Sequence, residues 1–435
     1  MATIKIDFGK TSGSIKPLHA GGQPPMVSTA HFNFDIIREM GAPYSRLHDA
    51  GGNFAGNLYV DIPNIFRDFD ADENDPKNYD FCFTDQLITA LVDAGIEPYY
   101  RLGVTIENHC SIKSFRIDPP KDYEKWARIA EHIMAHYLEG WADGFHYQIT
   151  YWEIWNEPEC FSKFPNGIFN QMWTGTAEDY YRLYEVASKH LKARFPYAKI
   201  GGYASCGFYS LTDTEAAEKP HHAIIYGRQN QFFDGFFRYI REHGCPIDFF
   251  SWHSYQNTKN TIIWAKALKE KLERYGYGDL PTHLNEWNPY HMEHGTAHHG
   301  AEVAAMMLGM QYEPAVHVMC IYDMRYIAGD YAPLFDAYHR PTYAWYALAA
   351  FNKLYQLKGQ AELQCDTEDL YAVAATDGKK KALMMANLTG KPQPLKIEGM
   401  DLSDAHIYVM DDVRLLSFAA SVKEIPVNGV VLIEA

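Results

Sequence analysis

The chain has 435 residues, of which 47% are hydrophobic and 15% aromatic, and its formal net charge at pH 7 is −16. A chain of this length can bury a large core, and one large domain with a smaller one is the natural expectation. Because affinity for nucleic acid rests largely on Lys and Arg side chains that neutralise phosphates, the acidic balance argues against DNA or RNA as a partner.

The N-terminal segment MATIKIDFGKTSGSIK lacks the basic and apolar regions of a secretory signal. No run near 18 apolar residues, the length that spans a bilayer, occurs in the sequence. We therefore expect a cytoplasmic protein without a membrane partner, or a secreted or periplasmic one if a signal peptide was removed. A homo-oligomer is compatible with this composition.

Short apolar runs alternate with amphipathic stretches up to about residue 357, which is typical of βα units around a parallel sheet. The candidate strands lie at 17–22, 43–49, 96–103, 149–157, 199–205, 247–255, 281–288 and 315–323. The candidate helices lie at 84–95, 122–138, 177–195, 235–244, 261–276, 300–312 and 341–357. This pattern predicts an α/β fold, a (β/α)8 TIM barrel over 10–357, with a doubly wound open sheet as the alternative.

After residue 357 the pattern changes to short alternating segments such as LYAVAAT and HIYVMDD, separated by Gly, Asp, Asn and Lys turns. These segments predict a C-terminal antiparallel β-sandwich over 358–435, to which residues 1–9 are expected to add a strand. The sequence contains no flexible linker between the two parts, so we expect them to pack together.

Two glutamates stand at the ends of candidate strands: Glu157 ends 149–157, and Glu286 lies near the end of 281–288. Their separation corresponds to three βα units, and side chains at the C-terminal ends of barrel strands converge on one mouth. Two carboxylates across a pocket suit glycoside cleavage, in which one protonates the leaving oxygen and the other attacks the anomeric carbon. A retaining mechanism places them roughly 5 to 5.5 Å apart.

Aromatic and amide side chains flank both glutamates. Trp152, Trp155 and Trp287 offer flat apolar faces for sugar rings, and Asn156 can hydrogen-bond a sugar hydroxyl. Strand parity places Trp152 and Trp155 on opposite sides, so at least one of them is expected to pack in the barrel wall.

The motifs WEIWNEP (152–158) and LNEWN (284–288) resemble those of glycoside hydrolase clan A. Within this clan the chain most resembles family 39, the β-xylosidase and α-L-iduronidase family. The supporting motifs are YSRLHD, FFSWHSY and HRPTYAWYAL, together with the trailing β-sandwich. The similarity runs over most of the chain.

The resemblance implies that Glu157 is the acid/base, Glu286 the nucleophile and Asn156 a ligand of the sugar 2-hydroxyl. It also implies that Arg46 supports the nucleophile. A buried ion pair inside the barrel is the structural alternative for Arg46, and the two interpretations overlap.

By the same resemblance, His48, His253 and Tyr255 line the subsite of the released sugar, although satisfied polar groups of the core remain an alternative. The last barrel strand reads CIYDMR and lacks the tryptophan that many clan relatives have there. Tyr322 or Asp323 is the expected replacement for its contact.

No metal or other cofactor is expected. The segment 291–300 contains four histidines, at positions 291, 294, 298 and 299, but without the H-E-x-x-H spacing of a metalloprotease. These histidines can instead donate hydrogen bonds near a sugar pocket. The N-terminal FGKTSGS has Ile4 where a phosphate-binding loop requires its first glycine.

The leading functional hypothesis is a retaining, exo-acting β-xylosidase type enzyme on plant-derived oligosaccharides or glycosides. The alternatives are an α-L-arabinofuranosidase, a β-galactosidase or β-glucosidase, and an endo-acting glycanase. A non-catalytic carbohydrate-binding protein is the alternative from another class, and it predicts the loss of one carboxylate. Both are present, which favours an enzyme.

Overall fold

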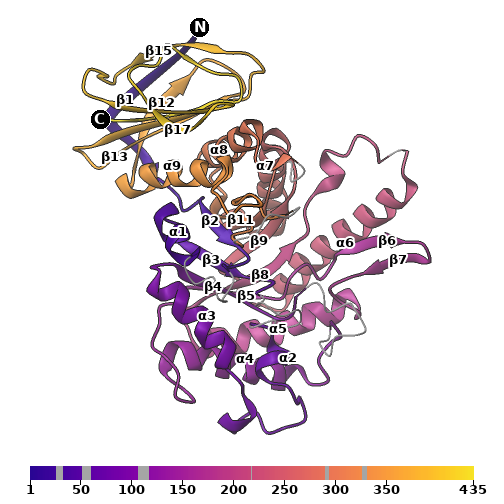
Figure 1. Cartoon of the computed structure of the whole chain (residues 1–435). Coiled ribbons are helices and arrows are strands. Elements are labelled where there is room, and N and C mark those ends of the chain that lie inside the picture. The colour runs from indigo at the N-terminus through magenta and orange to yellow at the C-terminus, as the bar shows by residue number, and fades with distance from the viewer. Residues whose placement is uncertain (26–32, 51–59, 106–116, 217, 290–292, 326–330) are drawn as a thin grey trace.

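The computed structural model describes residues 1–25, 33–50, 60–105, 117–216, 218–289, 293–325 and 331–435. It consists of a closed barrel surrounded by helices and a curled sheet packed on one side of it (Figure 1). Both chain termini lie in the curled sheet. In these ranges, none of the helices combines the length and the apolar character that a bilayer-spanning segment needs.

Eight parallel strands close the barrel in the order β10-β11-β2-β3-β4-β5-β8-β9. They are β2 (Ala20–Gly22), β3 (Tyr44–Leu47), β4 (Glu97–Leu102), β5 (Tyr151–Ile154), β8 (Lys199–Ser205), β9 (Phe249–Ser254), β10 (Thr282–Trp287) and β11 (Val316–Tyr322). Each coincides with one of the eight candidate strands, so the predicted TIM barrel is confirmed.

The helices of the described ranges surround the barrel (Figure 1). They are α1 (Asn33–Met40), α2 (Ile62–Ile65), α3 (Cys82–Asp93), α4 (Tyr123–Glu139), α5 (Ala177–Arg194), α6 (Pro220–Glu242), α7 (Thr258–Tyr275), α8 (Ala297–Met310) and α9 (Tyr343–Leu357). The prediction for α6, 235–244, was wrong at its start, because the helix begins at Pro220. Proline suits the first turn of a helix, and the residues that follow it carry too few regularly spaced apolar side chains to mark the helix in sequence.

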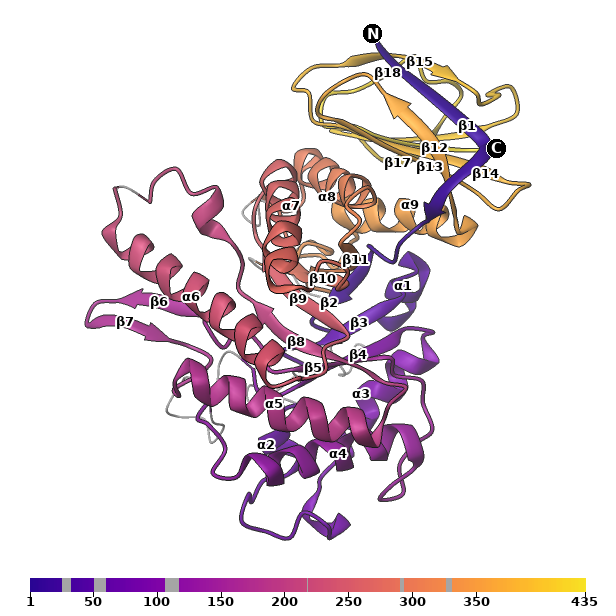
Figure 2. The same cartoon turned by 180° about the vertical axis from the view of Figure 1, so that it is seen from behind.

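Two short helices and a hairpin were not predicted. Helices α1 and α2 are only 8 and 4 residues long. The hairpin of β6 (Phe161–Phe164) and β7 (Gly167–Asn170) follows β5 and projects beside α6 in both views (Figures 1 and 2). The segment just after Glu157 therefore leaves the barrel as a protruding ribbon.

The C-terminal sheet has the strand order β17-β16-β19-β14-β13-β12-β1-β15-β18. Its strands are β1 (Ala2–Ser14), β12 (Gly359–Cys365), β13 (Leu370–Thr376), β14 (Lys381–Asn387), β15 (Gln393–Glu398), β16 (His406–Asp411), β17 (Arg414–Ala419), β18 (Glu424–Ile425) and β19 (Val430–Glu434). The sheet curls so that its two halves enclose a core of their own, which agrees with the expected sandwich. One pair, β1 with β15, is parallel, which the antiparallel prediction missed. The domain boundary at residue 357 stays a prediction.

Both faces of the central strands are buried. Val373 and Met384 belong to the same apolar cluster as α8 and α9, whereas Leu383 and Met385 belong to the cluster inside the curled sheet. Helix α8 is buried on all sides from His299 to the end, as expected of a helix between two layers. The sheet therefore completes the barrel core at this side.

We predict that removing residues 358–435 gives insoluble or aggregating protein. The cut would expose the apolar sides of α8 and α9 and leave β1 without β12, its antiparallel partner. The soluble fraction and the binding of an apolar dye should be measured beside the full chain. A soluble, fully active fragment of residues 1–357 would contradict the prediction.

Candidate active site

Glu157 stands on a strained turn directly after β5. Trp155 and Glu157 have φ angles of 73° and 45°, in the left-handed region that residues other than glycine seldom adopt. The Glu157 amide donates to the carbonyls of Tyr203, at 3.2 Å, and Ala204, at 3.0 Å. Backbone strain of this kind costs on the order of 1–3 kcal/mol and is typical of functional sites. Strand β8 therefore holds Glu157 in place.

Glu286 lies in β10, where the ladder with β9 shifts register between Leu284 and Glu286. Asn285 Nδ2 donates to Glu153 Oε1 at 2.6 Å, and Glu286 Oε2 accepts from Arg46 at 3.1 Å. Two consecutive residues of one strand thus contact the same polar network in the barrel interior.

Arg46, completely buried at the end of β3, is the centre of this network. Its Nε donates to Glu153 Oε2 at 2.8 Å, its Nη1 to Glu286 Oε2 at 3.1 Å, and its Nη2 to Asn156 Oδ1 at 2.6 Å. Burial by itself lowers the pKa of Arg46, but the Glu153 and Glu286 carboxylates outweigh it and raise the pKa above its ordinary value. The predicted support of the nucleophile and the alternative of a buried ion pair describe the same contact.

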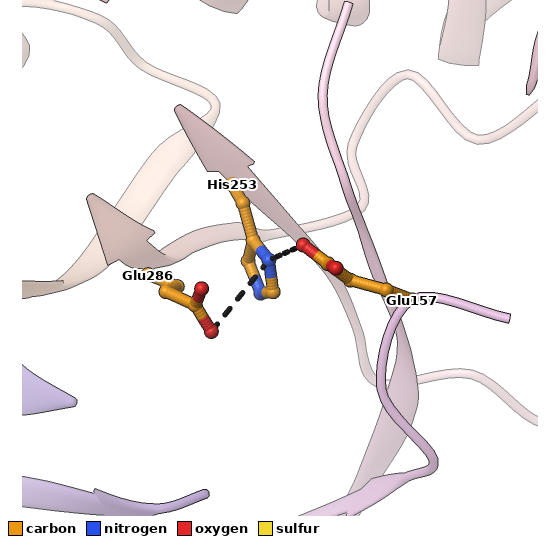
Figure 3. Close-up of side chains that lie close together, drawn as sticks. All are labelled: Glu157, His253 and Glu286. Atoms are coloured by element: carbon orange, nitrogen blue, oxygen red, sulfur yellow. Dashed lines mark hydrogen bonds and ion pairs between the residues drawn. The ribbon is translucent and has the colours of Figure 1, made fainter. Parts of the chain in front are cut away.

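His253 lies between the two glutamates (Figure 3). Its Nδ1 is 2.6 Å from Glu157 Oε1 and 3.7 Å from Glu286 Oε2. Burial lowers the pKa of His253, but the charges of Glu286 and Glu157 and the hydrogen bond to Glu157 raise it above the ordinary value of 6.5. The side chain of His253 is 0% exposed and contacts both carboxylates, and its place in the subsite of the released sugar stays a prediction.

The spacing of the two carboxylates is short. One oxygen of Glu157, one oxygen of Glu286 and one nitrogen of His253 all lie within 4.8 Å of one another. Inverting glycosidases separate their carboxyl groups by about 6.5–9.5 Å to admit a water molecule, whereas retaining ones need about 5–5.5 Å. An approach of at most 4.8 Å between single oxygens is compatible with the shorter separation.

The same three groups could in principle bind a metal ion. In the structure they form an ion-pair network, in which Arg46 directs a positive charge at Glu286 and His253 contacts both carboxylates.

Tyr255 donates its hydroxyl to Glu286 Oε1 at 2.7 Å, so Glu286 is bound at one oxygen by Tyr255 and at the other by Arg46. Burial and the charge of Glu286 raise the pKa of Tyr255 well above its ordinary value. The phenol therefore remains a proton donor across the physiological range. Tyr255 thus lies directly beside Glu286, and its place in the subsite of the released sugar stays a prediction.

His48 and Tyr322 converge on Asp49, which the sequence analysis did not select. The Tyr322 hydroxyl donates to Asp49 Oδ2 at 2.7 Å, and His48 Nε2 lies 3.4 Å from Asp49 Oδ1. Burial and the charge of Arg46 lower the pKa of His48 well below its ordinary value, so this imidazole is neutral. The ring of Tyr322 lies edge-on to the ring of Tyr255, with 6.5 Å between the ring centroids.

The three tryptophans are not open platforms. Trp152, Trp155 and Trp287 are at most 2% exposed. Trp152 stacks on Tyr100 at 4.9 Å, and the indole of Trp155 donates to the carbonyl of Met172. Both pack in the barrel wall, so the expectation that at least one does so is confirmed and their predicted role as sugar platforms is wrong. Trp287 presents no exposed face either.

Two histidines of the histidine-rich segment contact Asn288, which lies two residues after Glu286. Asn288 lies 3.1 Å from a ring nitrogen of His294 and 3.0 Å from one of His299. His298 contacts Glu293 at 2.8 Å. His291 lies outside the described residues.

Glu153 and Asn285 were missed, together with Asp49. The sequence contained one signal for Glu153: a charged residue inside an otherwise apolar strand, at the parity opposite to Trp152. A buried carboxylate there requires a cation, but the sequence does not identify which one.

We predict that His253→Gln reduces the melting temperature more at about pH 5.5 than at about pH 9. The pKa of His253 in the folded state is above 6.5, so protonated His253 stabilises the fold. This stabilisation is fully present at a pH below the pKa of the unfolded state, and it is lost as the pH rises through the pKa of the folded state.

His48→Gln is the matched control with the opposite sign. The pKa of His48 is lower in the folded state than in the unfolded state. Below the pKa of the unfolded state, His48 therefore destabilises the wild-type fold, and the Gln variant lacks this destabilisation. Thermal unfolding of both variants and the wild type between these pH values decides the matter. A pH-independent difference for His253→Gln would contradict the prediction.

Comparison with known structures places the fold. A glucosidase structure from Croceicoccus marinus has a TM-score of 0.76 and 18% sequence identity, and the match covers 100% of this chain and 98% of that one. At this identity the likeness supports the architecture alone.

Two β-xylosidases are similar in sequence. That of Geobacillus stearothermophilus is 22% identical over 281 residues, or 58% of this chain and 50% of the relative. That of Caldicellulosiruptor saccharolyticus is 25% identical over 322 residues, or 66% of this chain and 57% of the relative. The chain thus spans about half the length of the curated relatives it matches. The family model described as "Glycosyl hydrolases family 39" matches residues 53–356, and with the barrel and the paired glutamates this shows that the chain belongs to glycosyl hydrolase family 39.

Proposed function

We propose that the protein is a retaining glycosidase, an exo-acting enzyme of the β-xylosidase type on plant-derived oligosaccharides. The observation that carries the proposal is the separation of at most 4.8 Å between an oxygen of Glu157 and an oxygen of Glu286. Membership of the family and the two similar β-xylosidases support the choice of sugar.

In the first step Glu286 is the nucleophile. Its carboxylate attacks the anomeric carbon, the bond from that carbon to the leaving oxygen breaks, and the leaving oxygen takes the proton of Glu157. Arg46 and Tyr255 hold the two oxygens of Glu286 and fix its direction of attack. Asn156 accepts from Arg46 through Oδ1, which leaves its NH₂ group to donate to the sugar 2-hydroxyl.

In the second step Glu157 acts as a base. It takes a proton from water, the water oxygen attacks the anomeric carbon, and the ester bond to Glu286 breaks. While Glu286 is esterified it carries no charge, so one of the causes that raise the pKa of His253 is absent. His253 Nδ1 holds Glu157 Oε1, so Glu157 keeps its other oxygen for the water.

We expect retention of configuration, independence of metal ions and a preference for β-xylosides. A panel of nitrophenyl glycosides should rank the β-xyloside above the β-glucoside, β-galactoside and α-L-arabinofuranoside, and these arms separate the alternatives. NMR of the first-formed sugar should show the anomer of the substrate, and EDTA should leave the rate unchanged. An inverted first product would overturn the mechanism.

The two glutamates should respond differently to replacement. Glu286→Ala should lower kcat roughly 10⁴-fold or more on every substrate, because no nucleophile remains. Glu157→Ala should slow substrates with poor leaving groups about 10²–10⁴-fold but spare attack on dinitrophenyl glycosides, which need no acid. With the variant, azide should restore turnover and give a β-glycosyl azide.

Mass spectrometry identifies the nucleophile directly. A 2-deoxy-2-fluoro glycoside should label the peptide that contains Glu286. The Glu302→Gln variant is the control, because it removes a similarly buried carboxylate that binds Thr258 outside the site. The peptide of this variant that contains Glu286 should be labelled as in the wild type. A label on Glu157 or Glu153 would refute the assignment of roles.

A further inference from the structure

We propose that Glu153 is a positioning residue for the nucleophile, which balances the charge of Arg46 and fixes its direction. The inference rests on the proposed function, since it concerns how Glu286 is kept reactive. Glu153 does not contact the substrate pocket, because its side chain is 0% exposed.

Both oxygens of Glu153 are engaged in the network around Glu286. Glu153 Oε2 accepts from Arg46 Nε at 2.8 Å and lies 2.7 Å from Arg46 Nη2, while Oε1 accepts from Asn285 Nδ2 at 2.6 Å. Asn285 directly precedes Glu286 in β10. Glu153 therefore reaches the nucleophile by two routes, through the guanidinium that binds it and through the strand that carries it.

The charge balance of this group assigns a second task to Glu153. One buried guanidinium faces two carboxylates, Glu153 on its Nε side and Glu286 on its Nη1 side. A carboxylate that is the sole ion-pair partner of an arginine ionises more easily, and is a weaker nucleophile, than one that shares the arginine with a second carboxylate. By sharing Arg46, Glu153 leaves only part of the guanidinium charge to Glu286.

Replacing Glu153 leaves the other charged and titratable residues of the network unchanged in type. Those whose charges interact with Glu286 are His253, Tyr255, Tyr322 and Asp323. An oxygen of Glu157 also lies within 4.8 Å of an oxygen of Glu286. Those that interact with Arg46 or Glu153 are Tyr99, Tyr180, His48, His253 and Cys320. A change in the pH profile of a Glu153 variant can therefore be attributed to the lost charge.

The test is the pH dependence of kcat/KM for Glu153→Gln, which keeps the shape and removes the charge. Since the acid limb of this profile reports the essential base of the free enzyme, we expect it to move to lower pH by about one unit. We also expect kcat to fall about 10- to 100-fold, while KM changes less than about threefold, because Glu153 does not bind substrate.

Two further variants separate positioning from a merely structural role. Glu153→Asp keeps the charge but shortens the side chain, so kcat should fall at least about tenfold while the acid limb stays in place. Glu302→Gln, the buried carboxylate outside the network, should leave both kcat and the limb unchanged. Melting temperatures of all variants show whether folding is comparable.

An acid limb of Glu153→Gln within about 0.2 pH unit of the wild type overturns the inference. If Glu153→Gln does not fold, the Glu153→Asp variant provides the test. An unchanged kcat, or an acid limb that moves, in Glu153→Asp overturns the inference. A wild-type protein that hydrolyses no glycoside of the panel contradicts the proposed function instead. If the wild-type protein is active and the acid limb of Glu153→Gln does not move, only the proposed role of Glu153 is contradicted.

Discussion

The arrangement of the site depends on one buried cation. Arg46 is completely enclosed, and an uncompensated guanidinium in such a place costs several kcal/mol. The fold meets this cost with three acceptors from two other strands: Glu153 and Asn156 from the β5 side and Glu286 from β10. Because all three acceptors are bound by one rigid planar group, the relative positions of the strand ends are fixed at the same time.

Around this cation the polar groups form two connected layers. Glu153 and Asn285 lie below, wholly buried, and connect opposite sides of the barrel. Above them, His253 joins Glu157 to Glu286, which are 8% and 7% exposed. Reactive groups at the surface of a rigid, hydrogen-bonded base have little freedom to reorganise, which is the physical requirement for fixed attack geometry.

The C-terminal sheet stabilises the barrel from one side. Strands β13 and β14 are buried on both faces, one against α8 and α9 and one inside the curled sheet. The chain returns to this sheet at both ends, because β1 pairs with β12 and β15 before the first barrel strand begins. Helix α8 follows directly on the loop after β10, so the packing of the sheet also supports the strand that carries Glu286.

The sequence by itself determined the number and order of the barrel strands, because strand and helix periodicity are local properties of the chain. It also indicated Glu157 and Glu286, since polar groups at the ends of apolar strands stand out in a linear pattern. Only the tertiary structure decided which groups meet. The pairings of Arg46 with Glu153 and of His253 with Glu157 join residues 107 and 96 positions apart in the chain. The burial of Trp152 and Trp155 depends likewise on which side of β5 faces the helices, and a residue's type does not reveal whether its surroundings are solvent or core.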